Sequence, residues 1–237
     1  VRKAMTYRYR LFQAPLARFT GMAHAPQPPR LHVPASAAEA ARAWLAQQGI
    51  RAPFVVLAPG GTSVTRRWPA ARFAAVARTL AGRGEVAVVV VGGPAERAIT
   101  DEFAGTGAIN AIGALDLATT AAVVAGARAV LANDTSVMHM AVALDVPTRA
   151  VFGGSPWQRA GYEPDRLGVL AADLSCQPCG LDTCPYGAVP PCLEAVPAAR
   201  AVEAVQSAID AAAPASPRGT SGADGQPGSG TEMHGCT

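Results

Sequence analysis

Charged residues, aromatic residues and long hydrophobic runs are all scarce in this sequence. Only 16% of the 237 residues are charged and the formal net charge is +3, so the chain lacks the concentrated positive charge of nucleic-acid-binding proteins. The longest apolar stretch, Val86 to Val91 with its glycine neighbours, is far shorter than the roughly 20 residues of a membrane-spanning helix. The composition therefore argues against a nucleic-acid partner and against a transmembrane segment.

The amino-terminal sequence lacks the marks of export. It begins at Val1 without an initiating Met, and it has no apolar run followed by a small-residue cleavage site. Four of the five cysteines lie between Cys176 and Cys192, and without an export signal such cysteines indicate thiols or a metal site rather than disulfides. We therefore expect a cytoplasmic protein whose sequence is part of a longer chain.

The sequence does contain the alternating pattern of an α/β domain. Half of its residues are hydrophobic, which is ample for a buried core. Short apolar runs alternate with segments of helical periodicity, and together these predict a parallel sheet that is covered on both faces, a doubly wound α/β fold. The expected strands are 54–58, 86–91, 108–112, 129–132 and 148–152, and the expected helices are 69–80, 95–103, 117–125 and 136–144.

The flanking segments are predicted to be less regular. Residues 1–38 carry basic but no acidic residues, and they read as a helix and a linker whose charge either faces an anionic ligand or is merely solvated. Ser36 and Glu39 suggest a capping box at the start of a helix over 36–48. Residues 153–193 look irregular, a closing helix is expected over 195–212, and the Gly-, Pro-, Ser- and Thr-rich composition of 213–237 predicts disorder.

Three loops follow predicted strands, where an open α/β sheet binds its ligands. The first, residues 59–69, combines glycines that allow close backbone approach with hydroxyl and guanidinium groups that can bind phosphate oxygens. It suits a diphosphate, although a solvated loop with Trp68 packed on the core is an equally good interpretation. It is not a Walker motif, because Gly-x-x-x-x-Gly-Lys-Ser/Thr is absent. Its candidate ligand-binding residues are Thr62, Ser63, Arg66 and Arg67.

The other two loops open helices. In the second, Asp134 or Thr135 would cap the following helix, whose first amides and positive dipole end form an anion site, and His139 falls in its first turn. In the third, Glu96 follows Gly92 and Gly93; it either stabilises a helix dipole or binds a sugar hydroxyl.

In their order along the chain, these motifs resemble glycosyltransferase family 9, the bacterial heptosyltransferases. The resemblance covers about residues 54–210 and corresponds to the C-terminal half of the family. The motifs that carry it are Pro59-Gly60, Arg66-Arg67-Trp68-Pro69 with Phe73, Gly92-Gly93-Pro94, Asn133-Asp134-Thr135 with His139, and Ala141 through Pro147 to Phe152-Gly153.

The resemblance implies the GT-B architecture, in which two Rossmann-like domains face a cleft and the C-terminal one holds the nucleotide sugar. It implies inverting transfer of heptose from ADP-heptose to the lipopolysaccharide inner core, with no metal required, and the absence of Asp-x-Asp agrees with that. The lipid-borne acceptor implies at most peripheral membrane contact, at the inner face of the inner membrane. The implied donor-binding residues are Thr62, Ser63, Arg66, Arg67, Glu96, Asp134, Thr135, Ser136, Val137 and His139.

This chain departs from the family pattern in several places. Arg66 stands where lysine is usual, which keeps the charge but changes the geometry, and Ser136 stands where glycine is frequent. The family's N-terminal domain, with its acceptor site and catalytic base, has no counterpart before residue 54. We therefore expect residues 1–49 to be a remnant of that domain and its linker, 50–212 to bind the donor, and 213–237 to form a tail.

The residues leave other functions open. A GT-B transferase that uses a UDP- or dTDP-sugar, and a non-catalytic module that binds nucleotide sugars, both fit the same motifs. If the chain acts as it stands, we expect it to bind a donor but to transfer poorly or not at all.

The cysteines form a separate candidate site. Cys176 and Cys179 have the Cys-x-x-Cys spacing, and with Cys184 and Cys192 they would supply four thiolate ligands for a structural zinc ion. The spacing of the second pair is irregular for such a site. A loop of partly buried free thiols is therefore the alternative.

Overall fold

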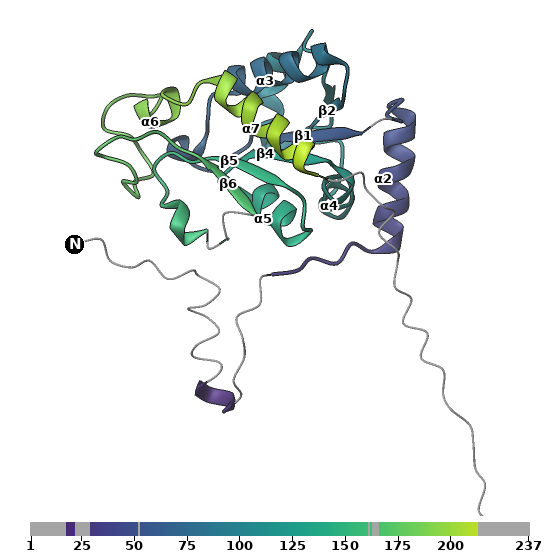
Figure 1. The fold of residues 1–237 in the computed structure, drawn as a ribbon, viewed down its shortest axis with the longest axis horizontal. Helices are drawn as coiled ribbons and strands as arrows, with labels where there is room; N and C mark the ends of the chain where they lie inside the picture. Colours follow the sequence, from purple (N-terminus) through teal and green to yellow (C-terminus); the bar gives the residue numbers. More distant parts are fainter. Residues whose placement is uncertain (1–17, 22–28, 52, 161, 163–165, 213–237) are drawn as a thin grey trace, which may run out of the picture.

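The computed structural model describes residues 18–21, 29–51, 53–160, 162 and 166–212. Within these ranges the strands form one sheet in the order β3-β2-β1-β4-β5-β6, and every neighbouring pair is parallel. The predicted doubly wound α/β fold is thus confirmed (Figure 1). The strands are β1 (Phe54–Ala58), β2 (Ala87–Val90), β3 (Ile109–Asn110), β4 (Ala129–Asn133), β5 (Thr148–Val151) and β6 (Leu167–Leu170).

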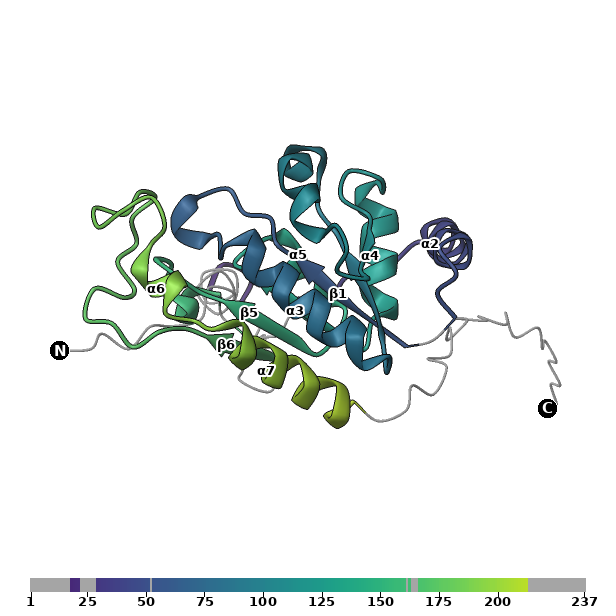
Figure 2. The ribbon, with the colours of Figure 1, turned by 90° about the horizontal axis from the view of Figure 1, so that it is seen from above.

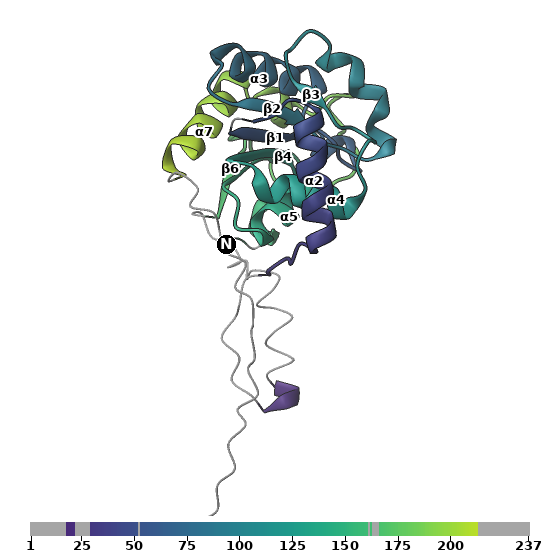
Figure 3. The same cartoon turned by 90° about the vertical axis from the view of Figure 1, so that its right-hand side faces the viewer.

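Helices cover both faces of this sheet. On one face α3 and α7 lie side by side, as the view from above shows (Figure 2), and on the other face lie α2, α4 and α5 (Figure 3). The α-helices are α2 (Ala35–Gln47), α3 (Ala70–Arg83), α4 (Leu117–Gly126), α5 (Ser136–Ala143), α6 (Pro191–Glu194) and α7 (Ala198–Ala211), and the 3₁₀ helices are η1 (Val64–Arg66), η2 (Pro94–Phe103) and η3 (Trp157–Arg159).

The two-residue period of a strand divides the core between the two faces. In β1, Val55 and Leu57 pack into the cluster beneath α3 and α7, whereas Phe54, Val56 and Ala58 pack into the cluster beneath α2, α4 and α5. All five residues of β1 are buried, because both faces of the strand are covered. This explains why the strand is a continuous apolar run rather than an alternating one.

The strand order places a crevice at the centre of the sheet. From β1 the chain proceeds outward to β2 and β3, and after the crossover to β4 it proceeds outward on the other side to β5 and β6. Loops that leave the carboxyl ends of β1 and β4 therefore turn in opposite directions, and α/β proteins of this type bind their ligands between them.

Several local predictions were wrong or incomplete. Helix α2 begins at Ala35 with Pro34 as its N-cap and no capping hydrogen bond from a side chain, so the predicted capping box of Ser36 and Glu39 does not form. Strand β6 lies in the segment expected to be irregular. The helix predicted over 95–103 is present, but it begins at Pro94 and is a 3₁₀ helix. The predictions for 1–17, 22–28 and 213–237 fall outside the described residues.

Helix α2 packs on α4, and its Ala37 and Ala41 belong to the same core cluster as Val56 of β1. The domain boundary at residue 49 remains a prediction.

In the part of the chain that the structure describes, no helix is both long and apolar enough to cross a membrane.

We predict that Gly153→Ala destabilises the fold. A Cβ atom at this buried position would overlap the carbonyl oxygen of Thr65 and would lie 2.8 Å from the Leu193 side chain. Because backbone cannot give way as a flexible side chain does, we expect the free energy of unfolding to fall by about 1–3 kcal/mol in urea titrations. Gly82→Ala in α3 is the control, since no atom lies within 4 Å of its added Cβ. Equal stability of both variants would contradict the prediction.

Candidate functional site

A cavity of about 980 Å³ opens at the carboxyl ends of the central strands, and we call it the crevice cavity. Its wall comes from the connections that follow β1, β2, β3, β4 and β5, together with the starts of α4 and α5. The three loops that the sequence analysis selected all contribute to it. The predicted ligand-binding residues that line it are Thr62, Arg66, Glu96, Asp134, Thr135, Ser136, Val137 and His139.

Ser63 and Arg67 are the predicted residues that do not line the crevice cavity. The Ser63 hydroxyl donates a hydrogen bond to the carbonyl oxygen of Asp182 (2.8 Å) and accepts one from the amide of Thr65 (3.3 Å). The Arg67 guanidinium donates to the carbonyl oxygen of Gly61 (2.8 and 3.1 Å). Both side chains therefore hold the backbone of the loop that carries Thr62 and Arg66.

Asn133, fully buried at the end of β4, joins the two sides of the crevice. Its side-chain amide donates to the carbonyl oxygens of Pro59 (2.8 Å) and Gly60 (3.0 Å), and its Oδ1 accepts from the amide of Trp68 (3.1 Å). One side chain thus fixes both ends of the loop between β1 and α3. Because the backbone groups at both ends are held, Thr62 and Arg66 are presented on a rigid loop.

The amino end of α5 faces the crevice cavity without a side-chain cap. Thr135 is the N-cap residue, but its hydroxyl makes no capping hydrogen bond, and the first turn contains no acidic residue. The Thr135 hydroxyl is buried and has no hydrogen-bond partner among the described residues. The capping role expected from the sequence is therefore not observed. Amides without intrahelical partners, the helix dipole and an unpartnered hydroxyl together form a corner suited to an anion, which we call the anion-binding corner.

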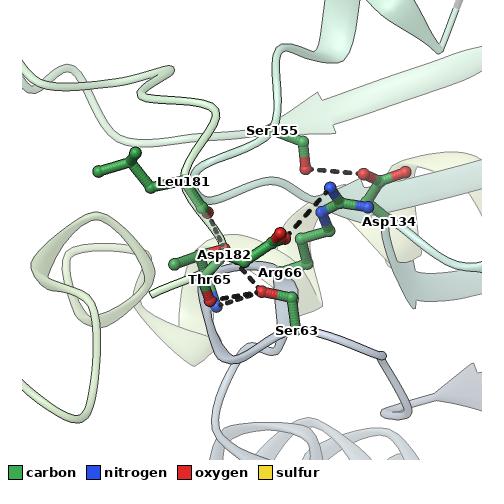
Figure 4. Close-up of polar contacts among 7 residues, drawn as sticks. All are labelled: Ser63, Thr65, Arg66, Asp134, Ser155, Leu181 and Asp182. Carbon is green, nitrogen blue, oxygen red and sulfur yellow. Dashed lines mark hydrogen bonds and ion pairs between the residues drawn. The ribbon is translucent and has the colours of Figure 1, made fainter. Parts of the chain in front are cut away.

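Arg66 approaches the crevice cavity from the opposite loop. Its guanidinium lies 3.7 Å from the Asp182 carboxylate, and the two side chains are 39% and 82% exposed (Figure 4). An ion pair this exposed contributes little to stability. The backbone of the Asp182 loop is instead held by Ser63 and by the Thr65 hydroxyl, which donates to the carbonyl oxygen of Leu181 (2.6 Å).

Glu96 lies where the loops after β1 and β2 meet. One of its carboxylate oxygens accepts a hydrogen bond from the amide of Gly93 (2.7 Å) and so caps η2. The other lies close to Gly60, since a Cβ atom there would come within 2.7 Å of it. The structure therefore places Glu96 at the start of a helix and in the crevice cavity, and its binding of a sugar hydroxyl remains a prediction.

Sequence reasoning missed Ser155 and Tyr162, which also line the crevice cavity. Ser155 donates a hydrogen bond to the Asp134 carboxylate (2.7 Å), and the Tyr162 hydroxyl lies 2.8 Å from Nδ1 of His139. Both residues belong to the connection between β5 and β6. This segment has no periodicity or motif that would have singled them out, so only the three-dimensional structure reveals them.

The four clustered cysteines line a second cavity of about 140 Å³, to which Thr65 of η1 also contributes. We call it the cysteine cavity. All four are free thiols. Burial raises the pKa of the Cys192 thiol, and the three neighbouring cysteines raise it further. Among the residues that the structure describes, no three His, Cys, Asp or Glu side chains are arranged to hold a metal ion. The zinc site therefore remains a prediction from the sequence.

Comparison with known proteins agrees with the motif analysis. The model of glycosyltransferase family 9 (heptosyltransferase) matches residues 4–189. Lipopolysaccharide heptosyltransferase 1 of Pseudomonas aeruginosa is 38% identical over 148 residues, which cover 61% of this chain and 41% of that protein.

Two solved structures share the fold. The family 9 glycosyltransferase of Veillonella parvula matches with a TM-score of 0.74 at 20% identity, over 88% of this chain and 61% of that one. The E. coli ADP-heptose heptosyltransferase II matches with a TM-score of 0.61 at 19% identity, over 80% of this chain and 56% of that one. The chain thus spans less than two thirds of the length of each of these relatives.

We predict that Asn133→Ala strongly destabilises the protein. The substitution leaves two carbonyl oxygens and one amide without the partner that Asn133 provides, and buried unpaired groups of this kind are costly. We expect the free energy of unfolding to fall by about 2–3 kcal/mol in urea titrations. The matched control is Asn110→Ala, because exposed Asn110 makes one local hydrogen bond, to the amide of Ile112. If the free energy of unfolding fell no further than in the control, Asn133 would not be what holds both ends of the loop between β1 and α3.

Proposed function

Because the chain belongs to glycosyltransferase family 9, the heptosyltransferase family, we propose that the crevice cavity binds a nucleotide sugar. The diphosphate would lie between the Arg66 guanidinium and the amino end of α5. The observation that carries this proposal is that these two groups, 70 residues apart in sequence, line the same cavity. A guanidinium and uncapped helix amides are both donors suited to phosphate oxygens.

The proposed donor is ADP-heptose. An E. coli heptosyltransferase of this fold was solved with ADP-2-deoxy-2-fluoro heptose; it matches with a TM-score of 0.51 at 21% identity, over 70% of this chain and 47% of that one. In this chain Glu96 would accept hydrogen bonds from the nucleoside. The Gly93 amide holds one of its carboxylate oxygens and so fixes the carboxylate in the cavity wall, with the other oxygen beside Gly60. The remaining polar residues of the wall would contact the heptose.

The proposed reaction is inverting transfer of heptose to the lipopolysaccharide inner core. An acceptor hydroxyl, deprotonated by a base that the family carries in its other half, attacks the anomeric carbon as the bond to the diphosphate breaks. Negative charge then grows on the departing ADP. Arg66 and the α5 amides would stabilise it, and preorganised donors of this kind are a major source of catalytic power. The lipid-borne acceptor would bring the protein to the inner face of the inner membrane.

We predict that Arg66→Ala weakens the binding of ADP by about 10- to 100-fold in calorimetric titrations, because it removes a charged donor to the diphosphate. Arg78→Ala is the matched control: it removes the same charge from an exposed position in α3. We expect the control to bind ADP like the wild type.

The nucleotide tests the donor assignment separately. Wild-type protein should bind ADP and ADP-heptose more tightly than UDP. If the protein preferred UDP, the assignment of ADP-heptose as the donor would be wrong, and a UDP-sugar would take its place. If neither Arg66→Ala nor Asp134→Ala weakened the binding of ADP-heptose, the assignment of the crevice cavity as the donor site would be withdrawn.

The zinc prediction is independent of the donor site. Tetrahedral coordination requires the sulfurs of Cys176, Cys179, Cys184 and Cys192 to come within about 2.3 Å of one ion. All four residues line the cysteine cavity, but among the described residues no three such side chains are already arranged around one ion, so zinc would have to draw them together. A zinc site predicts one Zn²⁺ per chain by elemental analysis and its loss in Cys179→Ser. Purified protein without stoichiometric zinc would end the proposal.

A further inference from the structure

Four polar side chains that line the crevice cavity follow one another in a row. Ser155 donates a hydrogen bond to Oδ2 of Asp134 (2.7 Å). Oδ1 of the same carboxylate lies 4.0 Å from Nε2 of His139. On its other side the His139 ring meets Tyr162, whose hydroxyl is 2.8 Å from Nδ1. The row therefore runs Ser155, Asp134, His139, Tyr162.

The outer members of this row restrain the inner ones. The Asp134 side chain is 16% exposed, and its hydrogen bond from the buried Ser155 fixes the rotation of the carboxylate (Figure 4). Oδ1 is then the oxygen that lies 4.0 Å from His139. The His139 side chain is 46% exposed. Tyr162 holds it through the polar contact and through a tilted ring contact with centroids 5.5 Å apart.

Two different segments supply the row. Asp134 lies in the turn between β4 and α5 and His139 lies in α5, whereas Ser155 and Tyr162 belong to the connection between β5 and β6. The orientation of the inner pair therefore depends on how the β5–β6 connection fits against the start of α5. Burial raises the pKa of the Tyr162 phenol, an effect that nearby Arg166 opposes, so the hydroxyl keeps its proton at neutral pH.

The chemistry of the row differs from that of the anion-binding corner. An ionised carboxylate only accepts hydrogen bonds, and it repels the equally acceptor-rich diphosphate. It pairs well with sugar hydroxyls, which donate. Arg66, in contrast, only donates and carries the opposite charge. Asp134 directly precedes the N-cap Thr135, so the row adjoins the anion-binding corner. It therefore lies on the side from which it could meet a glycosyl group attached to a diphosphate in that corner.

We propose that Ser155 and Tyr162 are positioning residues that hold Asp134 and His139 in the orientation in which this pair meets the glycosyl part of the donor. The inference rests on the proposed donor site and adds two residues to it. It assigns their effect to recognition of the sugar rather than of ADP.

The test compares two ligands in calorimetric titrations of the same variants. In Ser155→Ala and Tyr162→Phe we expect the affinity for ADP-heptose to fall by about 5- to 10-fold, as the loss of one hydrogen bond predicts, while the affinity for ADP stays within about twofold of wild type. Ser155→Thr keeps a hydroxyl and should restore most of the affinity for ADP-heptose. The matched controls are Ser207→Ala in α7 and Tyr186→Phe, since both residues are exposed and neither lines the crevice cavity.

The outcomes separate this inference from the proposed function. An equal loss of affinity for ADP and ADP-heptose, accompanied by a lower melting temperature, would mean a merely structural role and would overturn the inference. Unchanged affinities, or a wild type that binds ADP-heptose no better than ADP, would also overturn it while leaving the diphosphate site in place. A wild type that binds neither ligand would refute both the inference and the proposed function.

Discussion

The hydrogen bonds of one buried side chain, Asn133, hold the crevice cavity together. An open parallel sheet leaves the loops after β1 and β4 to diverge, and nothing in the sheet itself fixes how far apart they lie. Asn133 ends β4 and reaches across to the carbonyl oxygens of Pro59 and Gly60 and to the amide of Trp68. Because it satisfies backbone groups at both ends of one loop, the position of Arg66 relative to the amino end of α5 follows from this contact.

The crevice cavity is lined by both positively charged hydrogen-bond donors and negatively charged acceptors. Arg66 and the uncapped start of α5 supply hydrogen-bond donors and positive potential to the cavity, whereas Glu96 and Asp134 supply acceptors. Each carboxylate is held by a hydrogen bond, Glu96 by the Gly93 amide of its own turn and Asp134 by the Ser155 hydroxyl of a neighbouring loop. A ligand that combines an anionic group with hydroxyls matches these groups, and a nucleotide sugar has that form.

The sequence predicted the sheet well because its strands are buried on both faces. β1 is a continuous apolar run, so its bounds were predicted correctly from composition alone. β6 was missed because its four residues lie at the sheet edge in a segment without periodicity. Similarly, the residue types around 59–69 indicated a phosphate-binding loop, but only the fold determines that Arg66 faces the cavity whereas Arg67 turns back to its own backbone.

Ser155 and Tyr162 could not have been predicted from sequence, because their roles depend on contacts with another loop. Family membership, by contrast, was predicted from the resemblance of the motifs, in their order along the chain, to glycosyltransferase family 9, and the family model confirms it. The central claim is that Arg66 and the start of α5 bind one diphosphate between them. A crystal structure of the protein with ADP tests it most directly. We expect phosphate oxygens within hydrogen-bond distance of both the Arg66 guanidinium and the first-turn amides of α5; a diphosphate that contacts neither group would refute this mode of binding.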